Sequence, residues 1–373
     1  MMERITQTML ANASLYNIQK NTGRMAMLNE QQTSGKRMQV PSDDPASSVD
    51  AMRLRNDIKA TEQYGRNTDD AAGWMQTVDT ALQGTSNTLK VAREKMIAAN
   101  SGAMGPTSHA ALAEDLRAQA EALMNASNST YLGRTVFAGN SDKGITFTKS
   151  AAGVFTPTES DAVTAQDVTR RLSVNHTIAA NADGNKIFGT GTVTYSWVDK
   201  DGAALTVADP PPYPVKTATM TNEEYKTLTD KYATDLKTYQ TNVTDPIKAA
   251  GGKLTVSSVN NPNIMNVLMQ AATELDKQPV NQDRLDALQN ALNSREEVVL
   301  TELASLGAKH KVVLERQESV KFDRDNLAGQ LSGVEDVDLQ KTIIDMALAE
   351  MSYKASLDAT QRVIQPSLLD YLR

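Results

Sequence analysis

Apolar side chains near the end of the chain recur at helical spacing. From Leu339 onward they alternate in steps of four and three residues, which places one side of a long helix against a partner. The predicted packing positions on this side are Leu339, Ile343, Met346, Tyr353, Leu357, Ile364, Leu368, Leu369, Tyr371 and Leu372. A second row, at Ile344, Leu348, Met351 and Ala355, lies beside the first. The apolar side is therefore too wide for one partner helix, and we expect another chain to cover it.

The beginning of the chain carries a weaker version of the same pattern. The predicted packing positions are Ile5, Met9, Leu15, Tyr16 and Ile18. Polar residues interrupt this face, so an isolated helix here is marginal in water. The first residues lack the basic start and apolar run of a cleaved secretory signal, and no stretch of about 18 apolar residues occurs. We expect neither membrane insertion nor a cleaved signal.

Proline and aspartate mark the first boundary between helices. Pro41 is predicted to stop the first helix, and Pro45 fits the first turn of the next one. The acidic pair Asp43–Asp44 is interpreted as a helix cap rather than as a catalytic or metal-binding pair. The next helix is expected from about residue 46 to residue 100, and another from about 108 to 131. The register of the first of these is Trp74, Val78, Ala81, Thr85, Leu89, Ala92, Met96 and Ala99.

The amino-acid composition changes after residue 132. Glycine, threonine, valine and proline dominate to about residue 259, in short β-prone runs, so we expect a separate and mostly β insertion. Within it, Thr221 opens a helix with a capping-box pattern, and Tyr225, Tyr232 and Tyr239 fall on one face. This stripe is interpreted as packing onto the insertion, with a sugar-stacking surface as the alternative. Helical periodicity returns from about Ile264, giving a multidomain α+β fold of long helices around the insertion.

Composition removes several classes of function. Lys and Arg total 38 against 45 Asp and Glu, and a net charge of −7 argues against nucleic acid as a partner. There is no cysteine, which excludes thiolate metal sites and cysteine nucleophiles. His109, His176 and His310 stand too far apart for a zinc motif. No acid, base and nucleophile pattern converges, so we expect no enzyme, metal or cofactor.

Several segments resemble the hook–filament junction proteins of the bacterial flagellum, which are flagellin-like. The first lies between Thr33 and Pro45, where the matching residues are Gly35, Lys36, Arg37, Pro41, Ser42, Asp43, Asp44 and Pro45. Segments 132–139, 303–309, 331–339 and 353–357 and the ending 367–372 are similar as well. The resemblance covers about residues 1–140 and 260–373.

This resemblance implies an architecture and a role. Residues 1–40 with 336–373 are expected to form terminal assembly helices, residues 41–140 with 260–335 a helical stem, and residues 141–259 an outer variable domain. The implied function is a structural adaptor between hook and filament, located outside the cell on the flagellum. The implied partners are further copies of the chain in a ring, the first hook-associated protein, flagellin, and an export chaperone on the C-terminal helix. Export through the flagellar type III pathway is implied too.

Two alternatives remain open at this point. The first is flagellin, the filament subunit itself, although proline on both sides of Asp43–Asp44 and the Asp370–Leu372 ending favour a junction protein. The second is a shaft-displayed adhesin, or a displayed enzyme, acting through residues 141–259.

Overall fold

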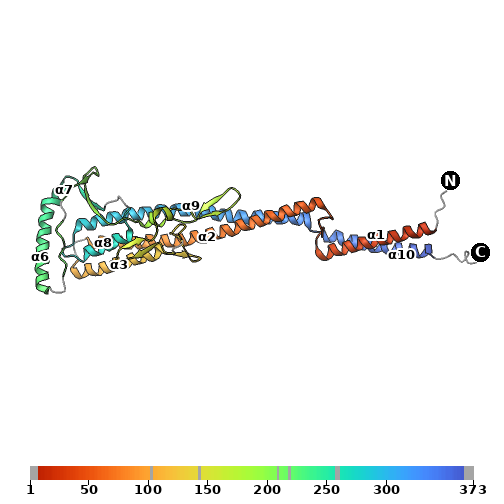
Figure 1. Cartoon of the computed structure of the whole chain (residues 1–373), viewed down its shortest axis with the longest axis horizontal. Coiled ribbons are helices and arrows are strands. Elements are labelled where there is room, and N and C mark those ends of the chain that lie inside the picture. The colour runs from red at the N-terminus through yellow and green to blue at the C-terminus, as the bar shows by residue number, and fades with distance from the viewer. Residues whose placement is uncertain are drawn as a thin grey trace, which may run out of the picture. The chain divides into compact units, whose positions relative to one another are not determined.

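The computed structural model describes residues 7–100, 104–141, 144–207, 210–216, 220–256 and 261–364. The chain divides into two compact units, Met1–Tyr64 with Ser319–Arg373 and Gly65–Glu318. The first unit therefore combines the two ends of the sequence, the second is the continuous stretch between them, and each is described by itself. The predicted division into three domains is a different partition and stays a prediction. Figure 1 colours the helices and strands by their position along the chain.

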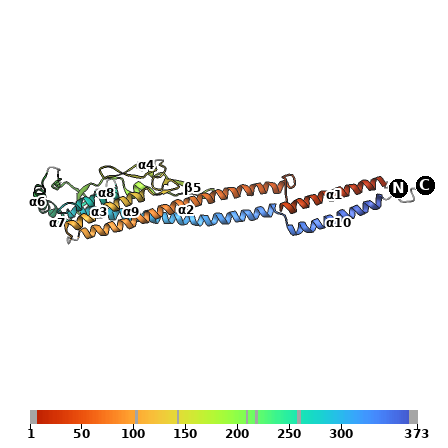
Figure 2. The same cartoon turned by 90° about the horizontal axis from the view of Figure 1, so that it is seen from below.

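The first unit contains a pair of antiparallel terminal helices, α1 (Gln7–Ser34) and α10 (Leu339–Ile364). They lie side by side in both views (Figures 1 and 2). The same unit holds the first turns of α2 (Pro45–Ala99) and the last turns of α9 (Gln282–Glu335). No helix among the described residues combines the length and the apolar character that crossing a membrane requires.

The second unit is built around a helical core. It contains the remainder of α2 and α9, together with α3 (Pro106–Ser127) and α8 (Ile264–Leu275). All eight positions of the predicted register from Trp74 to Ala99 are buried, which confirms that face of α2. Arg93 of α2 bonds Glu296 of α9 at 3.2 Å, so the two helices run side by side here. The return of helical character is interrupted between Leu275 and Gln282, a break that the sequence pattern did not predict.

Among the described residues of the second unit, the strands are short and form four small antiparallel sheets. Three of these sheets are single pairs: β1 (Thr130–Tyr131) with β2 (Arg134–Thr135), β3 (Phe147–Lys149) with β4 (Phe155–Pro157), and β5 (Thr169–Arg171) with β6 (Thr177–Ala179). The fourth has the order β8 (Ala204–Leu205), β7 (Tyr195–Val198), β9 (Lys253–Val256). Two short helices, α4 (Asp161–Thr164) and α5 (Gly184–Phe188), lie between the strands in sequence.

The small sheets share one apolar core with the helices. Phe188 packs edge-on against Phe137 and Phe147, with ring centroids 5.3 and 5.8 Å apart. These rings belong to the same buried cluster as Trp74 of α2 and Leu268 of α8. The strands therefore gain most of their burial from the helices, since strands of two to four residues cannot form a core of their own.

The predicted helix after Thr221 is present as α6 (Asn222–Tyr239). Its capping box is complete: the Thr221 hydroxyl accepts from the Glu224 amide at 3.2 Å, and the Glu224 carboxylate accepts from the Thr221 amide at 2.9 Å. The helix continues through one π-helical turn, η1 (Gln240–Thr244), into α7 (Asp245–Ala249). Tyr232 is buried, as expected for a residue that packs the helix onto the rest of the unit.

Candidate functional site

The predicted motif residues Gly35, Lys36 and Arg37 lie where the chain passes between the terminal helices and the stem helices. Two backbone hydrogen bonds join the outgoing and returning segments: the Arg37 amide donates to the Glu335 carbonyl at 2.7 Å, and the Val337 amide donates to the Gly35 carbonyl at 3.0 Å. They form an isolated antiparallel bridge between Lys36 and Asp336. We call residues 35–47 and 332–341 together the crossover.

Gly35 ends the first helix. Its amide donates to the Gln31 carbonyl at 2.9 Å, and its φ of +67° is the left-handed conformation that closes many helices. At this φ, a residue with a Cβ is strained by its own backbone. Apart from the adjoining residues, no atom lies within 4 Å of the position of an added Cβ, so the backbone conformation alone disfavours a side chain there. The prediction that Pro41 stops the helix was therefore wrong: α1 ends at Ser34.

A buried carboxylate holds the two segments together through charge. Glu335 is only 5% exposed, and its oxygens lie 3.3 Å from Lys36 Nζ and 2.8 Å from Arg55 Nε. Lys36 also bonds Asp336 Oδ1 at 2.7 Å. The hydrogen bond to Asp336 raises the pKa of Lys36, and the hydrogen bonds from Lys36 and Ser332 lower the pKa of Asp336. Two cations thus compensate the charge of a carboxylate that would otherwise be costly to bury, and Lys36 also donates a hydrogen bond to it.

Arg37 connects the end of α1 with the start of α2. Its guanidinium donates to the Ser47 hydroxyl at 2.9 Å and lies 3.6 Å from an Asp44 carboxylate oxygen. Its carbonyl accepts from the Gln31 amide side chain at 3.0 Å. This one residue therefore reaches both helices that the crossover joins.

Asp43 and Asp44 accept hydrogen bonds from two different turns. Asp44 caps α2, accepting from the Ser47 amide at 3.1 Å and from the Ser47 hydroxyl at 2.6 Å. Asp43 instead accepts from the Gln39 and Val40 amides, both at 3.0 Å, so it closes the preceding turn and does not cap α2 as predicted. These hydrogen bonds lower the pKa of both carboxyls. Pro45 is the first residue of α2, whereas Pro41 and Ser42 are exposed in the connecting turn.

The two terminal helices meet along seams that are small and polar. On α10 the covered or half-covered positions alternate by four and three: Thr342, Met346, Ala349, Tyr353, Ser356 and Thr360. The matching positions of α1 are Ser14, Ile18, Asn21, Met25, Leu28 and Gln31. The Asn21 amide donates to the Ser356 hydroxyl at 2.9 Å across this seam. The terminal helices therefore have a partner within the chain, each in the other.

The most apolar face of α10 points away from α1. Ile344 is 61% exposed and Met351 58%, and the predicted packing residues Leu339, Ile343 and Leu357 are exposed too. On α1 the same holds for Met9 (65%), Tyr16 (66%) and Leu15. Of the predicted positions, Met346, Tyr353 and Ile18 face the partner helix. Ile5, Leu368, Leu369, Tyr371, Leu372 and the side chain of Ile364 lie outside the described residues.

Sequence reasoning missed the charged centre of the crossover. Glu335 and Asp336 were part of a matching segment but were not singled out, and Arg55 was not noticed. An adjacent acidic pair at the end of a long helix is a usable signal, whereas its cationic partners lie about 300 residues away in sequence. Within the described ranges, no group of His, Asp and Glu side chains is placed to hold a metal ion.

Comparison with known proteins places these features in a class. Residues 5–142 match the bacterial flagellin N-terminal helical region. Flagellar hook-associated protein 3 of Salmonella typhimurium is 30% identical over 176 residues, which is 47% of this chain and 55% of that protein. The protein of the same name from Escherichia coli is 26% identical over 203 residues, or 54% and 61% of the two chains. The matched part is thus little more than half the length of these relatives.

Solved structures show the same fold. The flagellar hook-associated protein-3 of Legionella pneumophila aligns with a TM-score of 0.52 at 14% identity, covering 76% of this chain and 98% of that one. FlgL of Xanthomonas campestris aligns with a TM-score of 0.51, also at 14% identity, over 75% and 99% of the chains.

The fold, and the match over residues 5–142, are similar to those of flagellin-like proteins. Within that class, the named relatives confirm the resemblance to the FlgL-type hook-associated protein 3.

Proposed function

We propose that the chain is a structural, non-enzymatic adaptor that joins the flagellar hook to the flagellin filament. Copies of the chain form a ring on the first hook-associated protein and present a surface on which flagellin assembles. The subunits are exported without a cleaved signal through the flagellar type III pathway and act outside the cell. A chaperone covers α10 before export.

The division of labour within the chain follows the proposed domains. Residues 1–40 with 336–373 make the contacts between copies, residues 41–140 with 260–335 form the stem, and residues 141–259 face outward. The crossover supports this assignment, because it lies at the boundary of the first two parts and fixes the start of α2 and α10 with backbone and ionic bonds.

The observation that carries the proposal is the uncovered apolar face of the terminal pair. Helix α10 offers its small and polar seam to α1 and leaves Ile344, Leu348 and Met351 exposed. Each large apolar side chain gains about 1.5–3 kcal/mol when fully buried, so six half-exposed ones on α10 would gain roughly 5–9 kcal/mol when neighbours cover them. These side chains stay exposed in a single subunit and are buried only when neighbouring subunits assemble around them, so the stabilisation is available only in the assembly.

Complementation of cells that lack their own junction protein tests the adaptor role. The wild-type chain is expected to restore attached filaments and swimming. The double variant Ile344→Ser, Met351→Ser is expected to be made and secreted but to leave filaments detached in the medium. Lys354→Ser, an exposed polar position on the same helix, serves as the control and is expected to behave as wild type. Attached filaments with the double variant would contradict the proposed role of this face.

Self-assembly separates the adaptor from flagellin. Purified protein seeded with filament fragments is expected to add no more than a short cap. Growth of long filaments from this chain alone would identify it as a filament subunit instead.

A further inference from the structure

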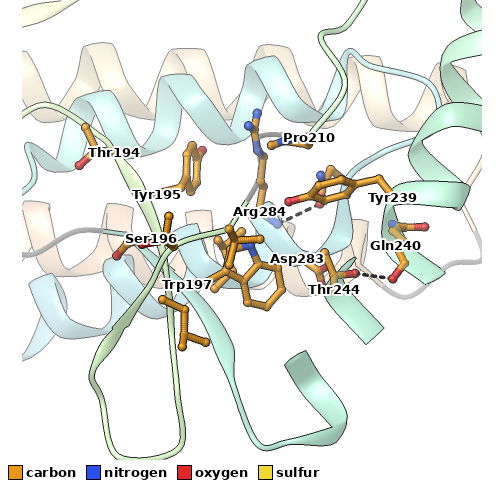
Figure 3. A pocket seen from close by; sticks show the side chains of 15 residues that line it. Thr194, Tyr195, Ser196, Trp197, Pro210, Tyr239, Gln240, Thr244, Asp283 and Arg284 are labelled. Carbon is orange, nitrogen blue, oxygen red and sulfur yellow. Dashed lines mark hydrogen bonds between the residues drawn. The ribbon is translucent and has the colours of Figure 1, made fainter. Parts of the chain in front are cut away.

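A cavity of about 390 Å³ lies in the second unit, far in sequence from the crossover. Figure 3 shows its walls: Tyr195 and Trp197 come from β7, Tyr239 and Gln240 from the α6–η1 junction, and Arg284 from the start of α9. Ligand pockets in proteins typically measure about 300–1,000 Å³, so this one has room for a small molecule.

Aromatic side chains are concentrated around the cavity. The chain has 10 tyrosines in all, and five of them lie at positions 195, 213, 225, 232 and 239. Tyr213 and Tyr232 pack edge-on against each other, with ring centroids 5.0 Å apart. Trp197 and Tyr239 line the cavity itself. Aromatic rings in a cavity wall offer apolar surface that a ligand can stack on.

The charged groups in the walls already have partners. Asp283 forms an ion pair with Lys248. The Arg284 guanidinium lies 3.1 Å from Glu274 Oε1 and 4.9 Å from the centre of the Tyr195 ring. A charged ligand would have to displace one of these pairs, which is costly. The cavity therefore favours a neutral ligand.

Polar groups in the walls exclude a purely apolar ligand. Amide and hydroxyl side chains line the cavity beside the rings: Asn281, Gln240, Ser196, Thr206 and Thr244. Covering such groups with hydrocarbon would leave them unsatisfied.

The π-helical turn adds an independent indication. A turn of this kind is rare and is frequently found at functional sites. Here η1 places Gln240 and Thr244 in the wall of the cavity, with the Thr244 hydroxyl donating to the Gln240 carbonyl at 3.1 Å.

We propose that this cavity binds a neutral saccharide of about one or two sugar rings. A sugar combines a C–H face that stacks on Trp197 and Tyr239 with hydroxyls that meet the amide and hydroxyl side chains, and it carries no charge. This binding site is independent of the proposed role in the flagellum.

Saturation-transfer NMR on the purified full chain tests the site. The probes are maltose, lactose, cellobiose and trehalose at about 10 mM each, a range that detects millimolar dissociation constants. At least one is expected to bind. Tyr239→Ala is expected to weaken that binding about tenfold, and Leu205→Arg, which fills the cavity from a partly exposed edge strand, to abolish it. Tyr225→Ala, which removes a ring of the same helix outside the cavity walls, is the matched control and is expected to bind as wild type.

Three results would overturn the proposal. The first is the absence of transfer to all four disaccharides. The second is equal binding by wild type and Leu205→Arg when near-ultraviolet circular dichroism shows both to be folded. The third is tighter binding of glucose 6-phosphate than of the neutral sugars, since the charges in the walls are already paired.

Discussion

Replacing Glu335 with glutamine removes the negative charge at the centre of the crossover. Breaking a buried ion pair on one side costs about 3–5 kcal/mol. Lys36 and Arg55 keep 44% and 57% of their side chains exposed, so water stabilises the two cations left behind. We therefore expect a smaller loss, about 1–2 kcal/mol, in the free energy that holds the terminal helices to the crossover.

Hydrogen exchange followed by mass spectrometry measures this loss of stability separately in the peptides of each helix. A change of about 1–2 kcal/mol speeds exchange about 5- to 30-fold in peptides from α1 and α10. Glu315→Gln is the control, because Glu315 is 65% exposed and its contact with Lys311 is 3.8 Å long. Unchanged exchange of α1 and α10 in Glu335→Gln, or an equal increase in the control, would refute the view that Glu335 secures the crossover.

Other predictions concern the backbone and the acidic pair. Gly35→Ala is expected to destabilise the first unit by about 1 kcal/mol because φ is positive there. Gly23→Ala inside α1 is expected to stabilise the same unit by about 0.5–1 kcal/mol. Urea unfolding followed at the terminal helices compares the two variants, and equal effects would contradict the role given to Gly35. The lowered pKa of Asp43 and of Asp44 means that their stabilisation is present above the unfolded-state pKa and is lost as the pH falls through the folded-state pKa. Asp44→Asn keeps a capping side chain without the charge, so its melting temperature should fall less on acidification than that of the wild type; parallel acid curves would count against this.

The long stem helices could be predicted from the sequence, because one face of a long helix repeats many times. The register from Trp74 to Ala99 is buried at every position. The small sheets were predictable only as a β-prone region, since strands of two to four residues take their register from the core they join. The π-helical turn after Tyr239 left no signal in the sequence.

The candidate site was only partly predictable for a different reason. Apolar spacing shows which positions of α10 are suited to packing, but it does not show which helix packs against them. The seam against α1 shares Met346 and Tyr353 with the predicted row, yet Ile343 and Leu357 are left exposed, because the facing side of α1 is largely polar. In the same way Pro41 was a stronger local signal than Gly35, although a left-handed glycine ends the helix six residues earlier.

The bridge between Lys36 and Asp336 also sets an order of events in folding. The two residues are 300 positions apart, so a chain that emerges with its N-terminus first cannot close this bridge until nearly all of it is out. Closing so long a loop costs conformational entropy, and the contacts that bring the stem helices together beforehand offset most of that cost. The contacts between α1 and α10 consequently form late, because α10 is the last described helix of the chain to emerge.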